Sequence, residues 1–151
     1  MAEKTLFEKI VDREIPAYFV WEDNEYAAFL TPFANTPGVT VVVPKKNPGD
    51  DVFKLSDVQI AALMVATKKV ANLLKTGLNA ERVALVFEGE AVPHVHAKLY
   101  PMHNMQAQRA NPQEVFFETY PGFITTQEGP KMDDAQLQAI QAKLKAANNE
   151  N

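Results

Sequence analysis

The sequence contains no cysteine, and that absence excludes several kinds of chemistry at once. Without thiols the chain cannot form a disulfide, build a zinc site with cysteine ligands or use a cysteine nucleophile. The longest apolar run is far too short to span a bilayer, so we expect no membrane association. The N-terminal residues mix charges of both signs and lack the apolar stretch of a signal peptide, which makes the cytoplasm the expected location.

An excess of positive charge is also absent. The formal net charge is −4 at pH 7, with 15 Lys and Arg residues against 19 Asp and Glu residues. Proteins that bind polymeric nucleic acid usually carry a basic face, because neutralising phosphates supplies much of their affinity. The only adjacent basic pairs are Lys45–Lys46 and Lys68–Lys69. We therefore expect no polymeric nucleic acid partner, whereas a small phosphorylated ligand is compatible with this charge.

The composition that is present is typical of one globular domain: 151 residues, of which 46% are hydrophobic and 23% charged. Apolar periodicity and turn residues predict a short helix, a hairpin, a strand, a long helix, two further strands and a C-terminal helix. In order, these segments are residues 5–15, 18–31, 40–44, 56–76, 82–89, 94–101 and 133–151. This order predicts an α+β fold, with a mostly antiparallel sheet and helices packed on one of its faces.

The helix signals are clearest in the long central segment. Ser56 and Gln59 form a capping box, and Gly77 supplies a left-handed stop. The residues predicted to face the sheet are Ile60, Leu63, Met64, Thr67, Val70, Leu73 and Leu74. The shorter N-terminal helix is expected to stop at Pro16.

The segment PHVHAKLYP contains two of the three histidines, and its alternation is informative. On a strand, successive side chains point to opposite faces of the sheet. His94, His96, Lys98 and Tyr100 would then project from the open face, while the apolar residues between them face the long helix. This arrangement places two imidazoles and an ammonium group in a row.

A neutral imidazole is a capable nucleophile towards phosphorus, and a neighbouring cation can stabilise charge on the phosphate oxygens. His96 and Lys98 would supply these two functions. Two alternatives stay open at this point. A single histidine on a strand is commonly a surface or core residue, and an H-x-H pair can be half of a metal site. A third metal ligand would have to be His103 or a distant carboxylate.

Several segments together resemble the histidine triad (HIT) superfamily, whose signature is His-φ-His-φ-His-φ-φ, where φ is apolar. The opening helix and hairpin of the family resemble TLFEKIVDREIPAYFVWEDNEYAAFL, and its next strand resembles NTPGVTVVVPKKN. With the histidine segment, the resemblance covers roughly residues 5–103 in the right order and spacing.

The resemblance implies roles for individual residues. His96 matches the middle histidine, which attacks the α-phosphorus of a nucleotide derivative and forms a transient nucleotidyl-histidine. His94 matches the first histidine, which helps to order the catalytic strand. Residues that match the apolar base pocket, each of which would also suit an ordinary core, are Leu6, Phe7, Ile10 and Phe29. Tyr100 is a further candidate contact for the nucleotide.

The chain also departs from the family pattern. Lys98 occupies the third triad position; because lysine normally titrates near pH 10.4, we interpret it as a phosphate-binding cation and not as an acid. Thr31 replaces the acidic residue that often holds the ribose hydroxyls. Val39 and Phe87 replace a histidine and an asparagine common in the family. The segment GEAVPH also lacks the usual hydroxyl that contacts the α-phosphate.

We therefore expect a HIT-like nucleotide-binding core over residues 1–103, with residues 104–151 as a helical C-terminal extension packed on the same domain. The expected activity is hydrolysis or nucleotidyl transfer at the α-phosphate of a nucleoside monophosphate derivative, without a metal or other cofactor. The alternative is a nucleotide-binding protein with little or no turnover. The family also implies a homodimer. The enzymatic hypothesis requires an accessible His96. It would fail if the ring were buried beneath a helix or had no cavity before it, although the expected architecture would still stand.

Overall fold

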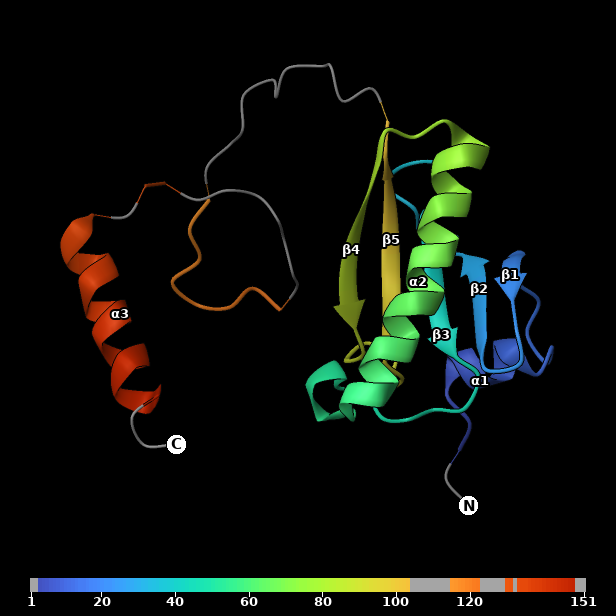
Figure 1. Cartoon of the computed structure of the whole chain (residues 1–151), viewed down its shortest axis with the longest axis horizontal. Helices are drawn as coiled ribbons and strands as arrows, with labels where there is room; N and C mark the ends of the chain where they lie inside the picture. The colour runs from blue at the N-terminus through green and yellow to red at the C-terminus, as the bar shows by residue number, and fades with distance from the viewer. Residues whose placement is uncertain (1–2, 104–114, 123–129, 132, 149–151) are drawn as a thin grey trace. The chain divides into compact units, whose positions relative to one another are not determined.

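The computed structural model describes residues 3–103, 115–122, 130–131 and 133–148 and divides into two units, residues 1–106 and 107–151. The elements are α1 (Leu6–Val11), β1 (Phe19–Glu22), β2 (Tyr26–Leu30), β3 (Thr40–Pro44), η1 (Val52–Lys54), α2 (Asp57–Leu78), β4 (Arg82–Glu88), β5 (His96–Met102) and α3 (Asp134–Asn148). The first eight belong to the first unit, and they confirm the α+β fold (Figure 1).

Five strands form a sheet in the order β1-β2-β3-β5-β4, and each runs antiparallel to its neighbours. The first two strands form the predicted hairpin. Asp23 holds its turn, because Oδ1 accepts hydrogen bonds from the backbone N–H groups of Glu25 and Tyr26 at 2.9 and 2.8 Å. The histidine-bearing strand β5 lies between β3 and β4, so its side chains are fixed from both sides.

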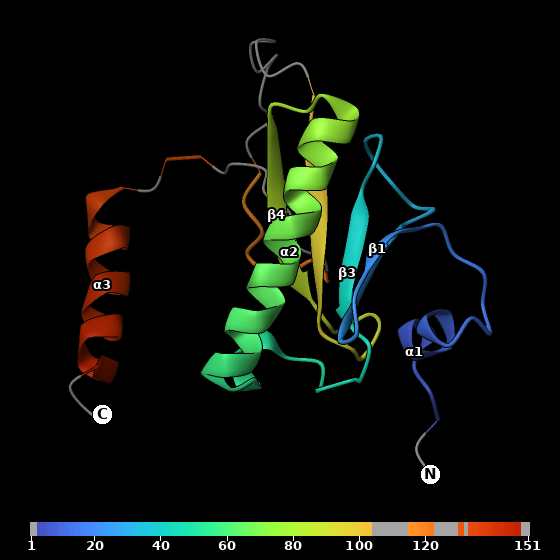
Figure 2. The same ribbon diagram turned by 45° about the vertical axis from the view of Figure 1, so that its right-hand side comes forward.

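The long helix α2 covers one face of the sheet (Figure 2). Its buried stripe packs against Ala97 and Leu99 of β5, as the alternation along that strand predicts. The cluster they form consists of Ala28, Val42, Ala66, Val70, Leu74, Ala97 and Leu99. The side chains on one face of β5 therefore pack in the core, and the polar side chains of β5 lie on its other face.

Some details of α2 differ from the prediction. The capping box at Ser56 is present, but Gly77 lies inside the helix and the left-handed stop is Asn79, with a φ of 51°. Asparagine tolerates this backbone region better than most residues. Met64 and Leu73, which we expected to face the sheet, are 45% and 44% exposed, because the buried stripe is narrower than predicted. The buried residues are Leu63, Ala66, Thr67, Val70 and Leu74.

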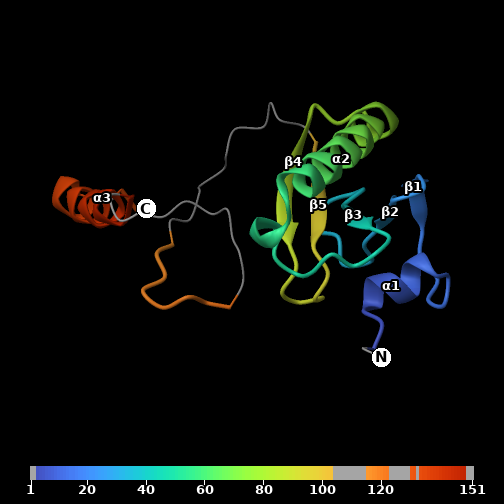
Figure 3. The same ribbon diagram turned by 60° about the horizontal axis from the view of Figure 1, so that its bottom comes forward.

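The opposite face of the sheet carries α1, so the prediction that the helices share one face is wrong (Figure 3). The apolar cluster on this side consists of Phe7, Ile10, Ala27, Phe29, Val41 and Val43. A capping box between Thr5 and Glu8 starts α1. The helix ends at Val11, well before Pro16, because the chain enters the left-handed region at Arg13 with a φ of 64°.

The second unit contains the predicted C-terminal helix as α3. Asp133 and Gln136 exchange hydrogen bonds at its start, from the backbone N–H of each to the side-chain oxygen of the other. In the described ranges, no helix has the length and apolar character needed to cross a membrane. The packing of residues 104–151 on the core stays a prediction.

A close backbone contact gives a prediction for stability. At Gly89, an added Cβ would lie 1.7 Å from the backbone oxygen of Asp50, so no side chain fits there. The neighbouring loop is docked on the same segment, since the backbone N–H of Val95 donates to the carbonyl of Gly49 at 2.7 Å. We expect Gly89→Ala to lower the free energy of unfolding by about 3 kcal/mol, measured by chemical denaturation.

Gly77 provides the matched control, because open space surrounds its position within α2. Alanine favours a helix interior over glycine by about 1 kcal/mol, so Gly77→Ala should stabilise the protein. A Gly89→Ala protein as stable as the wild type would show that the two loops are not in contact.

Candidate functional site

His96 is the first residue of β5, and the β4–β5 register places Glu88 directly opposite it. The next pair of residues on the same face is Lys98 opposite Val86. Because paired residues in an antiparallel ladder project to the same side, one face of this hairpin brings together an imidazole, a carboxylate and an ammonium group. The sequence predicted the first and third of these groups.

The His96 ring is held by polar contacts at both nitrogens. Nδ1 lies 2.9 Å from the backbone carbonyl oxygen of His94, and Nε2 lies 3.3 Å from Oε2 of Glu88. Because a carbonyl oxygen only accepts, Nδ1 is the donor and carries a hydrogen. This assignment leaves Nε2 as the ring atom that can act as a nucleophile, as the hypothesis requires.

The prediction that His94 and His96 stand on an open face is wrong. His94 is fully buried and His96 is 4% exposed. The edge of the His96 ring meets the Phe7 ring at a centroid distance of 4.8 Å, and His94 lies 5.9 Å from the same ring. Both histidines are therefore covered by α1. This is the arrangement that counts against the enzymatic hypothesis, which now depends on access to His96 from the side away from Phe7.

Glu88 and Lys98 provide the less enclosed side of this cluster. Their side chains are 22% and 26% exposed, whereas that of His96 is 5% exposed. A cavity of about 360 Å³ includes Glu88 in its lining, but neither His96 nor Lys98 lines it. Of the three side chains in this cluster, Glu88 and Lys98 therefore offer more exposed surface than His96.

His94 precedes β5 and ties three parts of the chain together. Its Nε2 donates to the carbonyl oxygen of Pro44 at 2.8 Å, and its Nδ1 accepts from the hydroxyl of Thr5 at 3.2 Å. The same hydroxyl caps α1 by accepting the backbone N–H of Glu8. His94 thus links α1, the end of β3 and the carbonyl that orients His96, which fits the ordering role that the resemblance implies.

Burial lowers the pKa of His94 below its usual value, although the Pro44 carbonyl and the charge of Glu8 oppose the shift. The folded state therefore holds a neutral ring, while the unfolded chain takes up a proton below about pH 6.5. His94 consequently contributes stability that is present above that pH and is lost as the pH falls through it.

A substitution at His94 tests this pH dependence. We expect His94→Gln to be less stable than the wild type by about 2 kcal/mol at pH 7.5, because two buried hydrogen bonds are impaired. Between pH 7 and 5 its unfolding free energy should decline less steeply than that of the wild type. Denaturant titrations at several pH values measure both quantities, and parallel curves for the two proteins would contradict a neutral buried His94.

Lys98 has the properties of a fixed cation. Its Nζ lies 3.5 Å from Oε2 of Glu88 and 5.8 Å from the centre of the Tyr100 ring. Burial opposes the charged form, but a hydrogen bond to Tyr100 and the charge of Glu88 outweigh it, so the pKa of Lys98 lies above its usual value. A lysine with a raised pKa keeps its charge near neutrality and is a poor acid there. Its role as a phosphate-binding cation stays a prediction.

The other predicted nucleotide contacts are only partly assembled. Phe7, Ile10 and Phe29 are buried in one apolar cluster, which favours their reading as core residues. Leu6, the neighbour of Phe7, is 46% exposed. Tyr100 lies beside Lys98 on β5, with the centre of its ring 5.8 Å from Nζ of the lysine.

Thr31 follows β2, and its surroundings are local. Its backbone N–H donates to the carbonyl of Val39 at 3.1 Å, and its hydroxyl accepts the backbone N–H of Phe33 at 3.3 Å. None of these interactions connects it with His96.

Glu88 is the site residue that sequence reasoning missed. In the sequence it stands in the run RVALVFEG, six residues before the first histidine of PHVHAKLYP. Its place opposite His96 depends on the length and path of the intervening loop, which has no sequence signal of its own. The β4–β5 register, which places Glu88 opposite His96, is the information that identifies it as a site residue.

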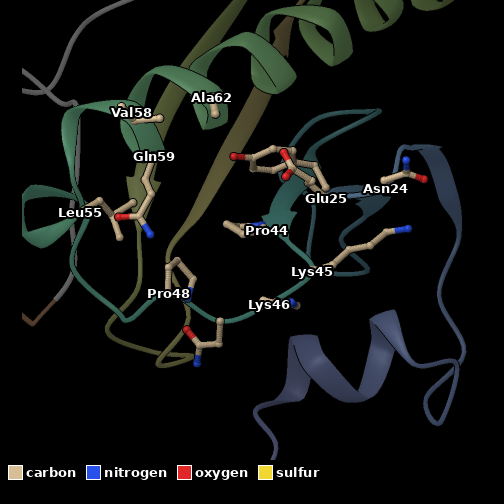
Figure 4. Close-up of a pocket in the computed structure, with 12 residues that line it drawn as sticks. Asn24, Glu25, Pro44, Lys45, Lys46, Pro48, Leu55, Val58, Gln59 and Ala62 are labelled. Carbon is tan, nitrogen blue, oxygen red and sulfur yellow. The ribbon is translucent and has the colours of Figure 1, made fainter.

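A larger cavity lies on a different part of the first unit (Figure 4). It has a volume of about 600 Å³ and is lined by the β1–β2 turn, the segment after β3 and the start of α2, including Lys45, Lys46 and Gln59. His96 and Lys98 are not among its lining residues. The nucleotide site predicted from the histidine strand is therefore not this cavity.

A metal site at the two histidines is poorly supported by the geometry. Both ring nitrogens of His94 already have hydrogen-bond partners, so neither has a free lone pair directed at an ion. In the part of the chain that the structure describes, no group of three or more His, Cys, Asp or Glu side chains is placed to hold a metal.

Comparison with known proteins decides the family. The HIT domain model matches residues 12–105, which is more than half of the chain. The chain belongs to the HIT family. An uncharacterised 13.1 kDa HIT-like protein from Mesomycoplasma hyorhinis is 32% identical over 106 residues, covering 67% of this chain and 95% of the relative.

Solved structures of HIT proteins share the fold. A HIT family hydrolase from Legionella pneumophila is 28% identical, with a TM-score of 0.58, over 68% of this chain and 96% of that one. A HIT family member from Bacillus subtilis is 22% identical, with a TM-score of 0.65, over 95% and 96% of the two chains. Hydrolases are thus among the HIT proteins that this chain resembles.

Proposed function

We propose that this HIT protein is a nucleotide hydrolase or nucleotidyl transferase that acts at the α-phosphate of a nucleoside monophosphate derivative. The observation that carries the proposal is the His96 ring. The His94 carbonyl holds Nδ1 as a donor, and Nε2 lies 3.3 Å from Oε2 of Glu88, the same oxygen that contacts Nζ of Lys98 at 3.5 Å. An oriented imidazole beside a fixed positive charge is suited to attack on phosphorus.

The reaction proceeds in two displacements. The lone pair on Nε2 of His96 attacks the α-phosphorus, a P–N bond forms, and the bond to the leaving group breaks with its electron pair. Lys98 stabilises the charge on the phosphoryl oxygens during this step. Water or another acceptor then attacks phosphorus, the P–N bond breaks, and its electron pair returns to Nε2. A hydrolase and a transferase differ only in the acceptor.

The nucleotide approaches Nε2 from the side of Glu88 and Lys98, because Phe7 covers the ring from the α1 side. Leu6 and Tyr100 retain exposed surface and are the better candidates for contacts with the base or sugar. Phe7, Ile10 and Phe29 support that side of the sheet from the core.

A second candidate function is nucleotide binding with little or no turnover. The burial of His96 specifically favours it, as does the contact between Nε2 and Glu88, since both restrict access to the nucleophile. Two positions that are polar in the family are apolar here, at Val39, which is buried, and at Phe87.

One experiment separates the two candidates. The protein is incubated with adenosine 5′-phosphoramidate, released AMP is measured by chromatography, and binding of AMP is measured by calorimetry. An enzyme releases AMP catalytically, over many turnovers. Tight AMP binding without release would support the second candidate, and absence of both binding and release would overturn both.

We further propose that the protein forms a homodimer, as its family membership suggests. Strand β4 is at one edge of the sheet, and exposed apolar residues such as Val65 and Leu73 lie on α2. A sheet edge that is unpaired among the described residues and an exposed apolar surface both favour association. Light scattering coupled to size exclusion would give twice the chain mass for a dimer; the mass of one chain would contradict it.

A further inference from the structure

Glu88 occupies the position from which a proton can be exchanged with the nucleophilic atom. It is the cross-strand partner of His96, and its Oε2 lies 3.3 Å from Nε2 of that ring. The same oxygen lies 3.5 Å from Nζ of Lys98. One carboxylate oxygen therefore contacts both groups on which the proposed reaction depends.

The contact between Nε2 and Oε2 requires a proton. Nδ1 of His96 already carries one hydrogen, because it donates to the His94 carbonyl. A bare Nε2 and an ionised carboxylate are both acceptors and would repel each other. The pair is consequently stable when it shares one additional proton, either as imidazolium with carboxylate or as neutral imidazole with carboxylic acid.

Because Lys98 occupies the third triad position, the proposed reaction needs a different group to donate a proton to the leaving group. A leaving group such as an amine must be protonated as its bond to phosphorus breaks, and an ammonium held in its charged form is a poor proton donor near neutrality. Lys98 can instead fix the carboxyl group of Glu88 in place through the 3.5 Å contact.

We propose that Glu88 is the general acid–base catalyst of this protein and takes over the proton transfer that Lys98 cannot perform. This inference rests on the proposed function. In this proposal, the shared proton of the resting site lies between Glu88 and His96, whose Oε2 and Nε2 are 3.3 Å apart. When substrate binds, Glu88 holds that proton, and Nε2 presents its lone pair to phosphorus.

Over one turnover, Glu88 donates one proton and takes up one proton. As Nε2 attacks, Glu88 gives its proton to the leaving group and becomes a carboxylate. The carboxylate then accepts a proton from the water that attacks the nucleotidyl-histidine, and the bond between phosphorus and Nε2 of His96 breaks. The products are the protonated leaving group and the nucleoside monophosphate, and Glu88 and His96 again share one proton.

Two substrates with different leaving groups test the role of Glu88. Adenosine 5′-phosphoramidate releases ammonia, and its nitrogen must take up a proton as the bond to phosphorus breaks, whereas the p-nitrophenyl ester of AMP releases a stable anion that needs none. We expect Glu88→Gln, which keeps the size of the side chain but cannot carry the proton, to lower kcat/KM for the phosphoramidate by about 100-fold or more. Its kcat/KM for the p-nitrophenyl ester should change little.

Glu90→Gln is the matched control. Glu90 is a neighbouring carboxylate whose Oε2 accepts the backbone N–H of Gly89 at 3.1 Å, and a glutamine oxygen can keep that bond. This variant should turn over both substrates at the wild-type rate. Equal losses on the two substrates in Glu88→Gln would overturn the acid–base role, because a structural defect slows both reactions. Failure of the wild type on both substrates would instead overturn the proposed function.

Discussion

Replacing His96 with alanine abolishes nucleotide turnover in the mechanism proposed here. The substitution removes Nε2, the only atom in the mechanism that forms a bond to phosphorus. We expect kcat for adenosine 5′-phosphoramidate to fall by at least about 10³-fold, as for the loss of other covalent nucleophiles. The measurement is AMP release under saturating substrate, with enough protein to detect the residual rate.

Loss of the buried His96 ring also affects stability, so the experiment needs a structural check. Removing a buried side chain costs about 1–3 kcal/mol, and circular dichroism would establish that the variant is folded. His103→Ala serves as the control, because His103 follows the other end of β5, where its Nε2 lies 3.0 Å from the carbonyl oxygen of Pro37. Wild-type turnover in folded His96→Ala would refute the role assigned to this residue.

The second large effect is expected at Lys98. Methionine has a similar length and no charge, so Lys98→Met removes the cation while largely preserving the apolar contacts of the stem. Loss of one group that stabilises charge in the transition state typically costs about 10²–10³-fold in kcat. We expect a loss in this range, measured with the p-nitrophenyl ester of AMP, whose leaving group needs no proton.

Lys98→Arg distinguishes charge from shape in this experiment. It retains the positive charge beside Glu88 and should recover part of the activity that Lys98→Met loses. If Lys98→Met were as active as the wild type, the phosphate-binding role would be wrong, and the lysine would serve only to pair with Glu88.

The sequence predicted the architecture well because its signals are local. Alternation along β5 correctly placed Ala97 and Leu99 beneath α2, and the capping box at Ser56 marked the start of that helix. The end of α2 was predicted at the wrong residue, because glycine is the residue most often found at a left-handed helix end. In the structure Asn79 takes that position, and Gly77 lies inside the helix. Local rules identify which kind of cap is present more reliably than which residue provides it.

The candidate site was predicted less completely, because it depends on packing between distant segments. Alternation along PHVHAKLYP predicted that His96 and Lys98 share one face of a strand, and the resemblance to the HIT superfamily implied their roles. The burial of His96 was missed because nothing in the N-terminal helix specifies that Phe7 packs on a strand almost ninety residues away. Glu88 was missed for the same reason, since the register of β4 against β5 brings it to the ring.

Because His96 is buried, the proposed activity requires that a substrate reach its ring from the side away from Phe7. With Phe7 on one side of the ring, the phosphorus must reach Nε2 where Glu88 now lies. Binding of a phosphate would then separate Glu88 from Nε2 and bring the phosphoryl group beside Lys98. Glu88, which contacts the ring, and Lys98, which contacts Glu88, are thus the neighbours of His96 that the proposed mechanism uses.

The central claim is that Nε2 of His96 forms a bond to phosphorus, and the stereochemistry of the reaction tests it directly. A substrate made chiral at the α-phosphorus with a sulfur atom and oxygen isotopes is hydrolysed, and the configuration of the product is determined by NMR. Two successive in-line displacements through His96 predict net retention. Net inversion would mean that water attacks the substrate in a single step and would contradict the account.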